Sequence, residues 1–415
     1  MKKYIINGNK PLNGEIHISG SKNLALPLLC LPLALKRKCR LNNIPHIKDI
    51  EVMLEIFDYL SISHSWCDTN SLLIDPSSFE YKDLTINEIS KIRASYYLIG
   101  ALLPHIKDLF ISNQGGCNFE ERPIDIHLKM FLDFGVVIKE EKDKMKFSFT
   151  KYKTNKIKLK NISFGATINA ILFGLHCKED VYIENVSSEC EVDYFISAIN
   201  ESGGKIEKEG NIIIIRKEHE YKEFVFDNIP SRMEIGTFAF IASALGTIKM
   251  FPVIKKDLKA IEDVLNMINA PFYYVEESLV VYKRKTPSSI VIETGVYPLF
   301  PTDLQPILTS LALSIPRIHV IKENIYKNRF SHVDELKKLG AMILKDNDTI
   351  LINGIFLLHG AYLKAKDLRG AASLVFGALL SKGESVIENI EYLERGYENF
   401  YEKLRSLGGD IGVEE

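Results

Sequence analysis

Apolar residues recur at helical spacing in two kinds of stretch that alternate along the chain. Stretches of the first kind are apolar at nearly every position, which is typical of a helix covered on all sides. Six of them open on polar residues and begin near Gly20, Ile92, Gly165, Ser231, Pro301 and Asp367. Stretches of the second kind carry apolar residues three and four positions apart, which predicts amphipathic outer helices. They run into strands over residues 52–63, 126–138, 192–207, 261–275, 332–343 and 400–411.

The alternation forms an internal repeat of about 70 residues. Landmarks at the starts of the buried helices are 65 to 74 residues apart: Lys22, Arg93, Thr167, Arg232, Asp303 and Arg369. Glycines stand where the outer helices should end, as expected for helix C-caps, at Gly135, Gly203, Gly340 and Gly408. Three repeats in each of two domains is the simplest assembly, with buried helices walled by sheets and outer helices. Accidental alternation, common in α/β proteins, is the alternative.

Composition and charge narrow the classes of function. The 415 residues include 52 Lys and Arg against 54 Asp and Glu, so the basic excess typical of nucleic-acid binding is missing. The six cysteines form no CxxC pair and suggest neither a disulfide framework nor a zinc site. The longest apolar run, Leu24–Leu35, is too short to span a membrane. These features predict a reduced, cytoplasmic enzyme, and they leave its oligomeric state open.

The polar residues at the starts of the buried helices are candidates for chemistry. Ser21 and Asp367 are the expected N-caps. Lys22, Arg93 and Arg369 are cations where the helix dipole favours an anion, which predicts an anionic ligand. Solvated side chains are the alternative at each position.

Three loops between predicted helices and strands carry further candidate functional residues. A glycine-rich loop places Cys117 near Arg122, an environment typical of reactive thiols. Arg329 and Arg395 each lie between a strand and the outer helix that follows it. Each arginine alone could equally be a solvated loop residue.

Seven motifs in order give these candidates a common interpretation. GSKNLALPLL, IRAS, GGC followed by RPIDIHL, FPTDLQP, NRFSHVDELKKLGA, DLRGAASLV and ERGYENFYEKLRSLG span residues 14–410. In them the chain resembles the UDP-N-acetylglucosamine 1-carboxyvinyltransferases of the enolpyruvyl transferase family. The resemblance implies an α/β fold of two similar inside-out α/β barrel domains with the active site between them. The first domain would comprise 22–229, and the second 1–21 with 230–415.

The resemblance also implies a reaction and its residues. Enolpyruvyl would pass from phosphoenolpyruvate to the 3-hydroxyl of UDP-N-acetylglucosamine with release of phosphate, the first committed step of peptidoglycan synthesis. Lys22, Arg122 and Arg395 would hold the donor's phosphate, and Arg329 and Arg369 its carboxylate. Asp303 would take or orient the hydroxyl proton, and Cys117 would protonate C3. No metal or other cofactor is needed, because the cations neutralise the charge.

The nucleotide-sugar site follows from the same resemblance. The implied residues are Asn23, Arg93, Arg122, Pro123, Ile124, Asp125, His127, Ser163, Phe164, Gly165, Asp303 and Ile325. Asn23 and Cys117 argue against the sister 5-enolpyruvylshikimate-3-phosphate synthases, which have Ser after the first Lys and lack the loop cysteine.

Five residues depart from the family pattern: Glu120, Glu121, Asn161, Ser231 and Lys327. Drift in a Lys- and Asn-rich lineage is one interpretation. The alternatives are a paralogue that acts on another uridine nucleotide, or a non-catalytic paralogue that binds a UDP-sugar.

Overall fold

The computed structural model describes residues 2–112, 124–327, 329–354 and 357–414. They form two compact units. The N-terminal unit comprises the described residues from Gly20 to Ile229, and the C-terminal unit those up to Ser19 and from Pro230 onward.

Three apolar helices pack against one another inside the N-terminal unit. They are α1 (Lys22–Leu35), α4 (Tyr97–Leu102) and α6 (Phe164–Gly174). The 3-10 helices η2 (Arg93–Tyr96) and η3 (Leu103–His105) extend α4 at both ends. The remaining helices of the unit are α2 (Lys48–Tyr59), α3 (Asn87–Lys91), α5 (Asp125–Phe134), α7 (Cys190–Glu201) and η1 (Pro76–Ser78).

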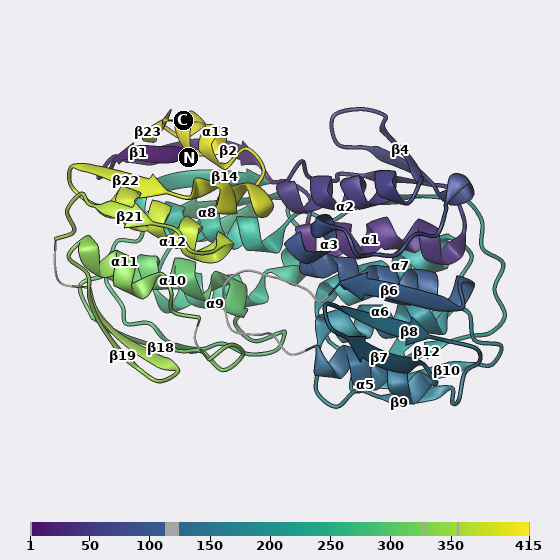
Figure 1. Cartoon of the computed structure of the whole chain (residues 1–415). Helices are drawn as coiled ribbons and strands as arrows, with labels where there is room; N and C mark the ends of the chain where they lie inside the picture. Colours follow the sequence, from purple (N-terminus) through teal and green to yellow (C-terminus); the bar gives the residue numbers. More distant parts are fainter. Residues whose placement is uncertain (1, 113–123, 328, 355–356, 415) are drawn as a thin grey trace. The chain divides into compact units, whose positions relative to one another are not determined.

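The described part of this unit holds three sheets (Figure 1). One has the order β13 (Phe224–Asp227), β3 (Cys39–Asn42), β5 (Leu72–Asp75), β4 (Ser63–Trp66). The next has the order β11 (Ile206–Glu209), β12 (Ile212–Ile215), β10 (Val181–Glu184), β9 (Lys156–Lys158). The third has the order β6 (Asp108–Ser112), β8 (Lys144–Ser148), β7 (Val137–Glu141).

The C-terminal unit is built on the same scheme. Its buried helices α8 (Arg232–Leu245), α10 (Gln305–Leu313) and α12 (Leu368–Leu380) pack together. The shorter helices are α9 (Lys259–Met267), α11 (Val333–Lys338), α13 (Phe400–Ser406), η4 (Lys255–Asp257), η5 (Thr302–Leu304) and η6 (Ile390–Arg395).

Three four-stranded sheets lie around those helices. Their orders are β15 (Phe272–Val275), β16 (Ser278–Tyr282), β14 (Gly246–Phe251), β2 (Leu12–His17), and β17 (Val291–Glu293), β18 (Ile318–Lys322), β20 (Thr349–Asn353), β19 (Met342–Asp346). The last is β21 (Tyr362–Lys364), β22 (Glu384–Glu388), β1 (Lys3–Asn7), β23 (Asp410–Glu414). Because β1 pairs with β23, the first and last strands lie side by side (Figure 1).

Each four-stranded sheet has one parallel pair followed by two antiparallel pairs. In three of these sheets, the two parallel strands directly precede and follow one buried helix along the chain, as β9 and β10 do for α6. In the other two the leading strands are exchanged. β2 precedes α1 in sequence but pairs with β14, whereas β13 precedes α8 but pairs with β3.

The helix predictions from periodicity are confirmed. Each of the twelve stretches contains a helix, and the six that were predicted to be buried are so along most of their length. The four glycines predicted at helix ends all have positive φ, for example 105° at Gly135, where the absence of Cβ removes the strain.

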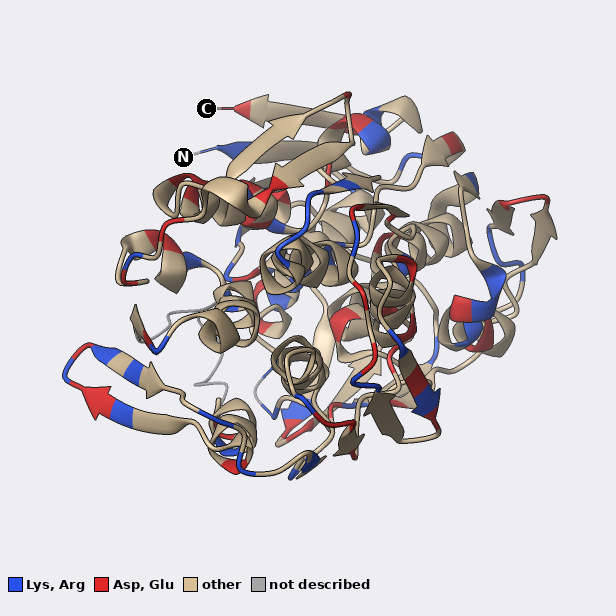
Figure 2. Cartoon of the chain, turned by 90° about the vertical axis from the view of Figure 1, so that its right-hand side faces the viewer, with Lys and Arg blue, Asp and Glu red and all other residues tan. Residues whose placement is uncertain are grey.

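Charged residues of both signs are interspersed along the strands and outer helices of the two units (Figure 2). No helix among the described residues is long and apolar enough to cross a membrane.

Candidate active site

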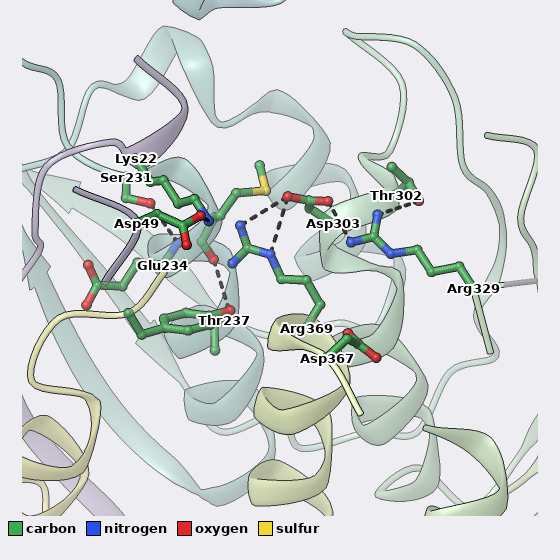
Figure 3. A network of polar contacts seen from close by, with 12 residues as sticks. Lys22, Asp49, Ser231, Glu234, Thr237, Thr302, Asp303, Arg329, Asp367 and Arg369 are labelled. Atoms are coloured by element: carbon green, nitrogen blue, oxygen red, sulfur yellow. Dashed lines mark hydrogen bonds and ion pairs between the residues drawn. The ribbon is translucent and has the colours of Figure 1, made fainter. Parts of the chain in front are cut away.

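A carboxylate flanked by two arginines forms the centre of the polar network in the C-terminal unit (Figure 3). Asp303 lies in η5, just ahead of buried α10, and Arg369 lies in the first turn of α12. Asp303 Oδ1 is 2.8 Å from Arg329 Nη2, and Oδ2 accepts from Arg369 Nη2 at 3.0 Å and Nε at 3.3 Å. The two helix starts and the segment after β18 thus bring three predicted residues into direct contact.

Both arginines of this cluster are buried, with 4% of each residue exposed. Buried charges are costly unless they are paired and hydrogen-bonded, and Asp303 supplies one carboxylate to two cations. Burial by itself would lower the pKa of Arg369, but Tyr397 and Asp303 outweigh it and raise the pKa above its ordinary value. The pair of arginines is therefore a preformed cationic site suited to a small anion.

Neighbouring residues hold the cluster in place. Arg369 lies 5.3 Å over the ring of Tyr397, whose hydroxyl is 2.8 Å from Thr237 Oγ1. Arg329 Nη1 donates to Thr302 Oγ1 at 3.0 Å, and that hydroxyl donates to Glu323 at 2.9 Å. Rotation of either guanidinium would break several of these contacts, so their orientation is fixed.

The start of α12 confirms one predicted cap. Asp367 accepts from Gly370 N at 2.8 Å and, through its other oxygen, from Ser331 Oγ at 2.7 Å. Elsewhere in the C-terminal unit, Arg395 ends η6 and is partly exposed. Ile325 is 38% exposed, and its N–H donates to Glu323.

In the N-terminal unit, Lys22 forms an ion pair with Asp49, which lies in the first turn of α2, at 2.5 Å (Figure 3). Asn23 follows in α1, and Arg93 opens η2. Ser21 is the N-cap residue of α1, as predicted, but its side chain makes no capping bond. Its carbonyl accepts the first intrahelical bond, from Ala25 N, and a bond from Asn228 Nδ2.

Carboxylates of the chain itself take the place of the predicted anionic ligand at two of the helix starts. Asp49 and Asp303 place negative charge beside Lys22 and Arg369, so carboxylates of the protein offset two of the three helix-start cations.

The start of α6 gathers several residues predicted for the nucleotide sugar. Ser163 caps the helix by accepting from Ala166 N at 3.3 Å, and Phe164 and Gly165 form its first turn. His127, on α5, is buried against Gly165, where an added Cβ would lie 3.0 Å from its ring. Ile124 precedes α5 and Asp125 opens it; the carboxylate of Asp125 lies 3.8 Å from Lys160 Nζ.

Some predicted residues lie outside the described part of the chain: Cys117, Arg122 and Pro123, together with the departures Glu120 and Glu121. Among the described residues, no group of His, Cys, Asp and Glu could hold a metal ion.

Several contributors escaped the sequence analysis. Asp49 and Tyr397 are ordinary residues of their elements and carry no local signal. Glu323 is fully buried but lies between Lys322 and Asn324, so it carries no local signal either. Asn169 does carry one, because it is an amide within an apolar helical stretch.

Comparisons with known proteins identify the family of the chain. The profile of the EPSP synthase (3-phosphoshikimate 1-carboxyvinyltransferase) family matches residues 6–404. The chain is 34% identical over 423 residues to UDP-N-acetylglucosamine 1-carboxyvinyltransferase 2 of Streptococcus mutans, and 36% identical over 419 residues to that of Streptococcus pneumoniae R6, each covering 100% of both chains.

Solved structures share the fold. The enolpyruvyl transferase NikO from Streptomyces tendae superposes with a TM-score of 0.90 at 21% identity, over 100% of this chain and 99% of that one. An EPSP synthase from Acinetobacter baumannii superposes with a TM-score of 0.77 at 13% identity, over 100% of both. By fold, by family profile and by full-length identity, the chain belongs to the enolpyruvyl transferase family.

Proposed function

We propose that the chain transfers enolpyruvyl from phosphoenolpyruvate to the 3-hydroxyl of UDP-N-acetylglucosamine, releasing phosphate in the first committed step of peptidoglycan synthesis. The full-length identity to UDP-N-acetylglucosamine 1-carboxyvinyltransferases supports these substrates. The observation that carries the chemistry is the contact of Asp303 with two buried arginines.

The donor explains why cations are needed. Phosphoenolpyruvate carries a carboxylate and a phosphate on three carbons, and arginine binds either group through two parallel hydrogen bonds. Arg329 and Arg369 hold the carboxylate in this proposal. Lys22, Arg122 and Arg395 hold the phosphate.

The reaction is an addition followed by an elimination. The acceptor oxygen attacks C2 as its proton passes to Asp303, and the Cys117 thiol protonates C3, which gives a tetrahedral ketal. Loss of the C3 proton and departure of phosphate then restore the double bond on the new ether. The chain's cations balance the negative charge throughout, so this scheme needs no metal.

The acceptor site draws on the remaining predicted residues. The uridine would contact Arg122, Pro123, Ile124, Asp125 and His127. Ser163, Phe164 and Gly165 would bind the diphosphate, because the start of α6 offers free N–H groups. Asn23, Arg93, Asp303 and Ile325 complete the set.

The architecture proposed with this function is two inside-out α/β barrels of three repeats each, over 22–229 and over 1–21 with 230–415. Three mutually packed apolar helices in each unit support it, as does the shared strand pairing of the four-stranded sheets. In the three-stranded sheet, a parallel bridge from Leu84 to Ile111 stands in the place of the fourth strand.

The departures that the structure describes do not favour another acceptor. Ser231 stands where the resemblance leads one to expect Asp. It caps α8 by accepting from Glu234 N at 3.3 Å, and Ser and Asp are equally good capping residues. Lys327 and Asn161 are exposed.

The test is a phosphate-release assay with phosphoenolpyruvate and a panel of acceptors, without added metal. We expect turnover that requires UDP-N-acetylglucosamine. Turnover with shikimate 3-phosphate instead, or with a different uridine nucleotide only, would refute the proposed acceptor. Binding of the UDP-sugar without any turnover would indicate the non-catalytic paralogue.

A further inference from the structure

Asn169 is a polar residue at 0% exposure in the largely apolar helix α6, and its amide bridges two neighbouring elements. Its Oδ1 accepts from the backbone N–H of Gly100, in α4, at 3.2 Å. Its Nδ2 is 3.0 Å from Nδ1 of His127, in α5. Three helices therefore meet at one side-chain amide.

The bond to Gly100 settles which way the amide points. A backbone N–H can only donate, so the atom of Asn169 that faces it must be the oxygen. The approach is close: a Cβ on Gly100 would lie 2.6 Å from Asn169 Oδ1, so a larger residue there would push the amide away. The nitrogen is thereby turned toward His127.

The orientation of the amide in turn determines the tautomer of the imidazole. An amide nitrogen can only donate, so His127 Nδ1 must accept and carries no proton. Burial, and next the positive charge of Arg93, lower the pKa of His127 to about 3, so the ring is neutral at physiological pH. The single proton of a neutral imidazole must then be on Nε2.

The Nε2 edge lies against the start of α6. A Cβ on Gly165 would lie 3.1 Å from Nε2, so glycine is the residue that allows the imidazole this close to the first turn. We propose that Asn169 is a positioning residue that locks His127 as the Nε2–H tautomer, which presents an uncharged donor of fixed direction to an acceptor oxygen of the UDP-sugar. The ligand in this inference rests on the proposed function, whereas the tautomer does not.

The tautomer can be measured directly. Long-range ¹H–¹⁵N NMR of the ¹⁵N-histidine-labelled full chain distinguishes protonated from unprotonated ring nitrogens. We expect His127 of the wild type to be protonated at Nε2 alone. Protonation at Nδ1 would overturn the proposal without any variant.

The substitution Asn169→Asp tests the role of the amide. A carboxylate can still accept from Gly100 but cannot donate, so His127 should become protonated at Nδ1. The matched control is Asn200→Asp on α7, whose amide bonds Ile206 instead. An unchanged His127 spectrum in a folded Asn169→Asp protein would overturn the proposal.

Calorimetric titration with UDP-N-acetylglucosamine tests the consequence. We expect Asn169→Asp to weaken binding about tenfold or more, as for loss of one well-placed hydrogen bond, and Asn200→Asp to match the wild type. A changed tautomer with unchanged affinity would overturn the positioning role. A wild type that binds no UDP-sugar would refute the proposed function and leave the tautomer assignment standing.

Discussion

Asp303 has two tasks in the proposed reaction, and they oppose one another. As a base it serves the acceptor hydroxyl, but in this structure its carboxylate occupies the two arginines proposed for the donor's carboxylate. Phosphoenolpyruvate must therefore compete with Asp303 for Arg329 and Arg369. In this proposal, the Asp303 carboxylate raises the rate of the chemical step but weakens the binding of phosphoenolpyruvate.

This competition predicts a separation of kinetic constants in Asp303→Asn. The amide cannot take a proton, so we expect kcat to fall by about 10²–10⁴-fold, the usual contribution of a general base. Because the arginines lose their anionic partner, KM for phosphoenolpyruvate should stay the same or fall. Steady-state kinetics check this against Asp334→Asn, an exposed carboxylate on α11 near Lys337. A large rise in KM with kcat intact would contradict the prediction.

A second residue-level prediction concerns the shape of the Arg369 side chain. Lysine keeps the charge but cannot reproduce the two-nitrogen contact with Asp303 or the planar stacking over Tyr397. We expect Arg369→Lys to lower kcat/KM for phosphoenolpyruvate about 10²-fold.

Arg405→Lys is the matched control, since Arg405 lies 5.5 Å over the ring of Tyr401 but is exposed. Equal losses in the two variants would show that general stacking, and not the contact with Asp303, is what matters.

At this scale the sequence indicates which residues open the buried helices, but not what they touch. Arg369 stands out because a cation at the start of a helix opposes the helix dipole, and Asp303 stands out through its motif. Their contact joins η5 to α12, 66 positions apart, and only tertiary packing creates it. The same holds for Asp49 beside Lys22.

Among the elements, the starts of the buried helices show how interchangeable capping residues are. Ser231 stands where the family commonly has Asp, and it caps α8 through Glu234 N. We expect Ser231→Ala to lower the free energy of unfolding by about 1 kcal/mol, and Ser231→Asp to change it by a few tenths. Urea titration checks the stability, and the acceptor panel should give the same preference for both variants. A new acceptor preference in Ser231→Asp would show that this departure is functional.

The helices were predictable, whereas the strand pairings were not. Periodicity located a helix in each of the twelve stretches because burial of one face or of all faces leaves a local pattern. The exchange of partners between β2 and β13 leaves no pattern in the sequence, because the composition of a strand does not depend on which partner it pairs with. The division of this stretch into η2, α4 and η3 was not predicted either, because a single turn of 3-10 helix is too short to leave a periodic pattern of its own.

For the whole molecule, three buried histidines make the stability depend on pH below neutrality. Burial lowers the pKa of His127, His176 and His332 from 6.5 to about 3, with nearby positive groups such as Arg93, His105 and Arg329 adding to the effect. Two of them belong to the N-terminal unit and one to the C-terminal unit. Acid should therefore weaken both units.

Stability falls with falling pH because the unfolded chain binds protons at a higher pH than the folded chain does. Below pH 6.5 the histidines of the unfolded chain take up protons while those of the folded chain stay neutral until about pH 3, so stability is lost progressively as the pH falls through that window. Each histidine lowers the free energy of unfolding by up to roughly 1.4 kcal/mol for each pH unit in this window. His176→Gln and His332→Gln should each make the urea midpoint less dependent on pH between 7 and 5. Lys178→Gln, an exposed neighbour of His176, should leave that dependence unchanged. The same slope in both histidine variants as in the wild type would contradict the prediction, because removing a group that binds a proton only on unfolding must reduce the proton uptake.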